Sequence, residues 1–159
     1  MNVTVLCVGK LKESYWREAC AEYAKRLGAF CKFRVEEVDE ERMAENPSPA
    51  QIEKVLEAEG ERLLRKIPHN AAVFALCIEG KELSSPALAE KIEGAGLLGK
   101  SNLVFVIGGS WGLSPQVKNS AFLRLSMSPM TFPHQLARVM VCEQIYRAFE
   151  ISSGGKYHK

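Results

Sequence analysis

The segment LVFVIGGSWGL, residues 103–113, decides the fold class of this chain. Its first five residues are apolar without alternation, which is typical of a strand buried on both faces of a parallel sheet. The glycine-rich turn Gly108–Gly112 follows directly, and Ser114-Pro115 then supplies the N-cap and first position of a short helix. A buried strand leading into a glycine-rich loop and a helix is the unit of an α/β fold, which binds ligands at the carboxyl ends of its strands.

The same unit recurs along the chain on either side of this segment. Apolar runs predict strands at residues 3–8, 31–38, 71–78, 102–107 and 122–127, the second of them nearer the sheet edge. Helices are expected from an N-cap at Ser14 to Leu27, behind Ser48-Pro49 to residue 67, behind Ser85-Pro86 to residue 98, behind Ser114-Pro115, and over residues 133–152. This order predicts one α/β domain over residues 1–159, with a mostly parallel sheet and helices on both faces.

Composition limits the kind of protein. The chain has 159 residues, of which 47% are hydrophobic and 25% charged, as in ordinary soluble domains. No apolar run approaches the ~18 residues of a membrane span. The five cysteines include no CxxC pair, so they are expected to be buried thiols rather than disulfides or zinc ligands. We therefore expect a cytoplasmic protein with no membrane or metal partner.

The last helix is apolar in nearly every direction. Its polar stripe is narrow and consists of Arg138, Glu143, Arg147 and Glu150. A helix on the outside of a sheet needs only one apolar face, so the extra surface must be covered. A second copy of the chain is the simplest cover and predicts a homodimer built partly on this helix. A helix buried within the monomer is the alternative.

Two glycine-rich segments resemble nucleotide-binding motifs. Residues 94–101 match the phosphate-loop pattern GxxxxGKS, but a helix precedes them and a strand follows, which is the reverse of that motif. The turn Gly108–Gly112 has the spacing GGxxG and not the dinucleotide pattern GxGxxG. Its glycines would let a ligand approach the backbone, although a turn without a ligand remains open.

Residues 127–135 and the end of the chain hold the other candidates. The loop Met127–Phe132 could offer an adenine ring an apolar slot and backbone hydrogen bonds, or be an ordinary connector. His134 could be a base, a phosphate contact or a surface residue, and Arg138, one turn later, could hold a phosphate or a developing enolate oxygen. The terminal Tyr157, His158 and Lys159 could stack on a base and contact an RNA backbone, although chain ends are usually disordered.

Taken together, these motifs resemble the ribosomal large subunit methyltransferase H family of the SPOUT class, over essentially the whole chain. The resemblance rests on residues 76–81 (LCIEGK), 105–113 (FVIGGSWGL), 125–126, 131–135 (TFPHQ), Arg138, 146–148 (YRA) and 157–159 (YHK). It implies a C-terminal trefoil knot and a homodimer with the active site at its interface. It also implies methylation of N3 of a pseudouridine in 23S rRNA of the assembled ribosome.

The resemblance further implies which residues bind the cofactor and take part in catalysis. S-adenosylmethionine would bind at Leu76, Gly108, Gly109, Met127, Ser128, Pro129, Met130, Thr131 and Phe132. His158 is our candidate base or proton relay, since an imidazole ordinarily titrates near pH ~6.5. Arg138 would stabilise charge or grip phosphate, Tyr157 would stack, Lys159 would contact RNA, and His134 would orient the loop. In the dimer the tail would serve the partner's pocket. The competing hypothesis is a non-catalytic α/β nucleotide-binding regulatory module in which the tail is idle.

Overall fold

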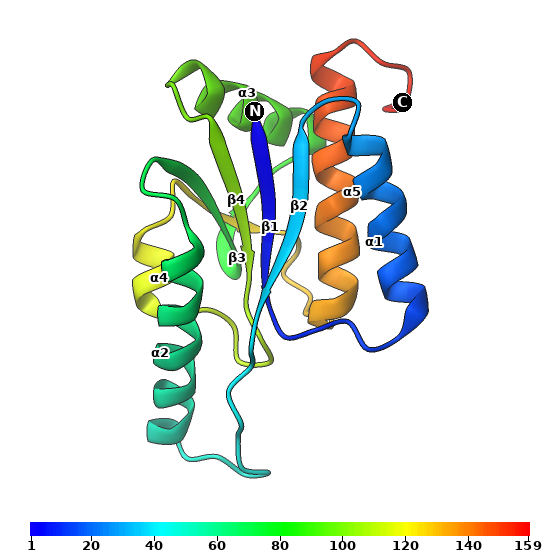
Figure 1. Ribbon diagram of the computed structural model, residues 1–159. Coiled ribbons are helices and arrows are strands. Elements are labelled where there is room, and N and C mark those ends of the chain that lie inside the picture. The colour runs from blue at the N-terminus through cyan, green and yellow to red at the C-terminus, as the bar shows by residue number, and fades with distance from the viewer.

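The computed structural model describes residues 1–159 and places five strands in one parallel sheet (Figure 1). The strand order is β2-β1-β4-β3-β5. The strands are β1 (Asn2–Val8), β2 (Lys32–Val38), β3 (Ala71–Glu82), β4 (Asn102–Ile107) and β5 (Leu123–Ser126). This confirms the predicted parallel sheet, including the edge position of β2.

Helices cover both faces of the sheet. They are α1 (Ser14–Leu27), α2 (Pro49–Lys66), α3 (Ser85–Leu97), α4 (Pro115–Asn119) and α5 (His134–Ser152). α1, α3 and α5 lie on one face, and α2 and α4 on the other (Figure 1). Two apolar cores result: Val3, Val5 and Cys7 of β1 point into the larger one, and Leu6 and Val8 into the smaller one. Because both faces of β1 are buried, its sequence is apolar at consecutive positions.

Serine-proline pairs begin two helices as predicted. The Ser48 Oγ accepts a hydrogen bond from the Gln51 N–H (3.2 Å), and the Gln51 side chain accepts one from the Ser48 N–H (2.8 Å). This capping box fixes the start of α2, with Pro49 in its first turn. Ser114 caps α4 in the same way, through the Val117 N–H (3.3 Å).

Two predicted N-caps are wrong by one residue. The cap of α3 is Ser84, whose Oγ accepts from the Ala87 N–H (3.3 Å), and Ser85 is already helical. The Ser85 hydroxyl instead donates to the Gln144 Oε1 of α5 (2.7 Å). Ser14 is the first residue of α1, and its cap position is occupied by Glu13 without any side-chain cap bond. The sequence does not show which of two adjacent residues is the N-cap, Ser84 or Ser85 in one case and Glu13 or Ser14 in the other. Only backbone geometry separates the cap from the first turn.

The third strand is longer than predicted because it contains a bulge. Leu76 and Lys81 both lie opposite Leu125 of β5, so residues 77–80 loop out between two stretches of pairing. Gly80 fits there because a Cβ on it would lie 2.7 Å from the Leu125 carbonyl carbon. The bulge leaves Cys77, Ile78 and Glu79 outside the pairing with β5.

The phosphate-loop look-alike has the polarity that the sequence predicted. Gly94 and Gly96 lie inside α3, Gly99 turns the chain with a φ of +79°, and β4 follows. No helix N-terminus is therefore available to cradle a phosphate in this segment. None of the helices combines the length and apolarity that a membrane crossing requires.

The prediction that the cysteines are buried holds for three of the five free thiols. Cys7, Cys20 and Cys142 are buried, whereas Cys31 and Cys77 are half-buried. Burial raises the pKa of Cys7 to about 12, so this thiol stays protonated. No three His, Cys, Asp or Glu side chains gather where they could share a metal ion.

Candidate functional site

A cavity of about 830 Å³ opens at the carboxyl ends of β3, β4 and β5. Small-molecule sites in proteins typically measure about 300–1,000 Å³. Its wall comes from four segments: the β3 bulge, the turn after β4, the short helix α4 and the chain from β5 into α5. The predicted cofactor residues that line it are Leu76, Gly108, Gly109, Met127, Ser128, Met130, Thr131 and Phe132. Pro129 is the one member of the predicted set outside the wall.

The turn after β4 is closed tightly on itself. Gly109 and Gly112 form an isolated antiparallel bridge, and Gly112 has a φ of +86°. A Cβ on Gly108 would lie 2.2 Å from the Gly112 carbonyl oxygen, which no real side chain can tolerate. Glycine at 108 is therefore required by the turn itself, and the turn presents bare backbone to the cavity.

The loop between β5 and α5 is held by its own serines. The Ser126 hydroxyl donates to the Ser128 carbonyl (3.2 Å), and the Ser128 Oγ accepts from the Met130 N–H (3.0 Å). These bonds leave Met130 on the cavity wall with 70% of its surface exposed. An exposed methionine beside free backbone groups suits a flat, partly apolar ligand.

His134, in the first turn of α5, lines the cavity and carries an unpaired polar atom on its buried side. Its ring lines the wall, yet its Nδ1 is buried and has no hydrogen-bond partner. Burial lowers the pKa of His134, and the nearby Arg138 guanidinium lowers it further. The ring is therefore neutral at pH 7, and its buried Nδ1 is one of the few polar atoms of the chain without a partner.

Arg138 lies behind this wall and not in it. Its side chain is 1% exposed, is ion-paired with Glu37 and donates from Nη2 to the Gly9 carbonyl (3.0 Å). These bonds tie α5 to the ends of β1 and β2. The proposed role of Arg138 toward phosphate or substrate charge would require this pair to open, and it remains a prediction.

Two charged residues of the wall were not predicted. Glu79 in the β3 bulge accepts a hydrogen bond from the Lys118 Nζ of α4, and this bond lowers the pKa of Glu79. The two residues are 39 positions apart in the sequence. The sequence could have indicated them only by position. Glu79 lies in the LCIEGK segment, and Lys118 lies on the helix that follows the glycine turn.

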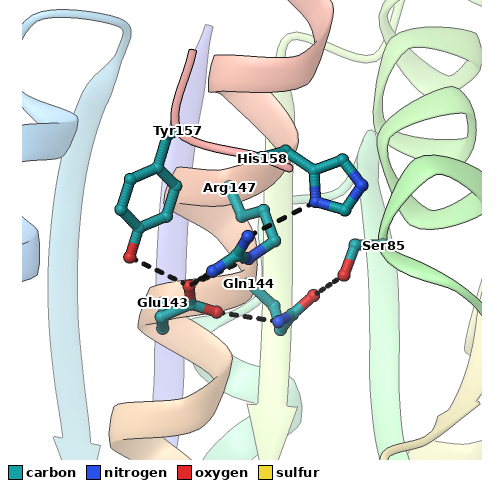
Figure 2. Close-up of polar contacts among 6 residues, drawn as sticks. All are labelled: Ser85, Glu143, Gln144, Arg147, Tyr157 and His158. Carbon is teal, nitrogen blue, oxygen red and sulfur yellow. Dashed lines mark hydrogen bonds and ion pairs between the residues drawn. The ribbon is translucent and has the colours of Figure 1, made fainter. Parts of the chain in front are cut away.

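The terminal residues lie against the far half of their own α5 (Figure 2). The Tyr157 hydroxyl donates to the Glu143 carboxylate (3.1 Å), which also accepts from the Arg147 Nη2 (2.6 Å). The Arg147 guanidinium lies 4.6 Å from the Tyr157 ring centre, and its Nη1 is 3.3 Å from the His158 Nδ1. Burial, with hydrogen bonds to Tyr23 and Glu143, raises the pKa of Tyr157 to about 12.

This position separates the tail from the cavity of its own chain. His134 and Arg147 are 13 residues apart on α5, which corresponds to roughly 20 Å along a helix. No tail residue lines the cavity, and Lys159 is exposed. One chain therefore brings together the predicted cofactor residues with His134, but not Tyr157, His158 and Lys159.

Comparisons with known proteins agree on one family. The family model described as "Predicted SPOUT methyltransferase" matches residues 1–158. The chain is 52% identical to the ribosomal RNA large subunit methyltransferase H of Ligilactobacillus salivarius (strain UCC118) and 49% identical to that of Levilactobacillus brevis. Both matches extend over 159 residues and cover 100% of either chain.

A solved structure shares the fold at low sequence identity. It is a probable methylase family protein from Haemophilus influenzae Rd KW20, with a TM-score of 0.52 and 13% identity, covering 99% of this chain and 70% of that one. The comparisons confirm the predicted SPOUT fold with its C-terminal knot, and they favour the methyltransferase over the regulatory module. This chain belongs to the SPOUT methyltransferase family.

Proposed function

We propose that this protein transfers the methyl group of S-adenosylmethionine to N3 of a pseudouridine in 23S rRNA of the assembled ribosome. The observation that carries the proposal is the cavity at the strand ends, whose wall contains eight of the nine residues expected to hold the cofactor. The full-length relatives named ribosomal RNA large subunit methyltransferase H support the choice of substrate.

The cavity suits an adenosyl group. Leu76, Met130 and Phe132 supply apolar surface, and the glycines of the Gly108–Gly112 turn expose backbone groups beside the Trp111 ring. When bound, S-adenosylmethionine supplies an electrophilic methyl group on a sulfonium. The protein then has to hold the pseudouridine in line with that group, and such positioning is worth roughly 7–11 kcal/mol where the geometry is good.

The tail of a second copy completes the site in our proposal. A homodimer that uses the apolar side of α5 would bring Tyr157, His158 and Lys159 of one chain to the cavity of the other. There Tyr157 stacks on the base, Lys159 contacts the RNA backbone and His158 accepts the N3 proton. Because the Arg147 guanidinium can only donate, its contact with the His158 Nδ1 leaves the ring proton on Nε2. His158 must leave Arg147 before its Nδ1 can act as a base.

The charge of the protein favours an assembled substrate over naked RNA. Its net charge is only +2, and affinity for free nucleic acid depends largely on Lys and Arg contacts with phosphates. Recognition then relies on the shape of the ribosome, and the protein works in the cytoplasm, where ribosomes are found.

A labelling experiment tests this function. The protein is incubated with tritiated S-adenosylmethionine and either ribosomes lacking the modification or the 23S rRNA extracted from them. Label mapped to N3 of a single pseudouridine, much stronger with ribosomes, is the expected result. No incorporation into either substrate would overturn the proposed function, and equal labelling of extracted rRNA would overturn the preference for the assembled particle.

A further inference from the structure

One ion pair stands out in the wall of the cavity. Of the 22 residues that line it, only Glu79 and Lys118 carry a full charge at neutral pH. The rest of the wall is apolar, glycine or neutral polar. A ligand that carried both a positive and a negative group would find oppositely charged side chains in the wall only at this pair.

The backbone holds both charges in place. The Arg124 Nε donates to the Lys118 carbonyl (3.0 Å), and its Nη2 donates to the Asn119 Oδ1 (2.7 Å), which fixes the end of α4. Glu79 is held by the β3 bulge, where Gly80 packs directly against the backbone of β5. The Lys118 side chain is 24% exposed, whereas that of Glu79 is 56% exposed. The lysine is therefore more enclosed than in an ordinary surface salt bridge, while the carboxylate stays open to solvent.

We propose that Lys118 and Glu79 bind the amino-acid end of S-adenosylmethionine, Lys118 at the α-carboxylate and Glu79 at the α-ammonium group. The inference rests on the proposed function, and it names the residues that would select a zwitterionic ligand. A half-enclosed charge that loses its partner carries a desolvation cost, but exchanging one partner for another of the same sign avoids it. A ligand that satisfies both charges at once therefore opens the pair at the lowest cost.

A truncated ligand separates this role from a purely structural one. 5′-Methylthioadenosine keeps the adenosyl and methylthio groups but lacks the amino-acid end. Titration calorimetry compares it with S-adenosylmethionine and S-adenosylhomocysteine on the wild-type protein and on Lys118→Met. We expect the variant to bind the two complete ligands about tenfold more weakly, the loss typical of a hydrogen bond to a charged group. Its affinity for 5′-methylthioadenosine should be unchanged.

A matched control and a charge swap sharpen the test. Lys66 pairs with Glu36 at 4.0 Å and lines no part of the cavity, so Lys66→Met should bind all three ligands as the wild type does. The double variant Glu79→Lys with Lys118→Glu restores an ion pair with reversed polarity. It should bind 5′-methylthioadenosine normally and the complete ligands weakly, because each ligand charge then meets its like.

The other outcomes are distinguishable. Equal weakening of all three ligands by Lys118→Met, or recovery of S-adenosylmethionine binding in the swapped variant, would show that the pair only closes the wall. Unchanged affinities throughout would remove both residues from the ligand site. Failure of the wild-type protein to bind any of the three ligands would instead overturn the proposed function, and this inference with it.

Discussion

At the scale of single residues, His134 makes stability depend on pH. Its pKa is lowered in the folded protein by burial and by Arg138, while an unfolded histidine titrates near ~6.5. Below that pH the unfolded chain binds more protons than the folded one, so the free energy of unfolding falls as the medium is acidified. We expect His134→Gln to lose less stability than the wild type between about pH 7 and pH 5.

Urea unfolding at a series of pH values measures this difference. His69→Gln is the matched control, because His69 lies exposed in the turn before β3. Parallel curves for the wild type and His134→Gln would show that the buried ring does not contribute to acid sensitivity.

Gly108 and Gly94 should respond oppositely to the same substitution. A Cβ on Gly108 would collide with the Gly112 carbonyl, so Gly108→Ala must open the turn and should cost about 1–3 kcal/mol of stability. Cofactor affinity should fall as well, because the displaced turn is cavity wall. Gly94 lies inside α3 with nothing within 4 Å of an added Cβ, and Gly94→Ala should stabilise the protein by about 0.5–1 kcal/mol. Thermal unfolding and calorimetry measure both effects, and similar behaviour of the two variants would contradict the argument.

At the scale of elements, a deletion in the tail should affect methylation without affecting cofactor binding in the cavity. Deleting Tyr157–Lys159 removes side chains that contact the far half of α5 and touch nothing in the cavity wall. Methylation of ribosomes should be abolished, while S-adenosylmethionine binding by calorimetry should match the wild type. A truncated protein that methylates at the full rate would show that the tail takes no part in the reaction.

The sequence predicts an element well when the residues that define it are close neighbours in the chain. Ser48-Pro49 and Ser114-Pro115 identify helix starts because the capping bonds span only three residues. The full length of β3 could not be predicted, since Leu76 and Lys81 share one partner only after β5 has paired. Glu79 and Lys118 were missed for the same reason, because their contact depends on that pairing. The loop 127–132 was found by composition, yet nothing in the sequence shows that the tail lies on α5.

At the scale of the whole molecule, the surface of α5 indicates a homodimer. Every residue from His134 to Ile151 is buried or half-buried, with α1 and α3 packed beside the helix. Half-buried apolar residues such as Met140 remain on the side away from the core. We expect sedimentation at micromolar concentration to show about twice the 17.7 kDa of one chain, from two-fold pairing of this surface.

Met140→Glu should shift that equilibrium toward the monomer without unfolding the chain, since Met140 is not part of the core. Circular dichroism provides the folding control. A wild-type protein that sediments only at 17.7 kDa would contradict the dimer and, with it, the delivery of the tail to a second cavity.

The position of β1 in the sheet has a consequence for the synthesis of this enzyme. Asn2 pairs with Lys32 on one side but with Asn102 on the other, so this interior strand lacks its second neighbour until most of the chain exists. At translation rates of about 5–20 residues per second, the intervening hundred residues take on the order of 5–20 s. During that interval a strongly apolar nascent strand stays open to chaperones and to other unfinished chains. We therefore expect the yield of folded enzyme to depend on protection of this strand as it leaves the ribosome.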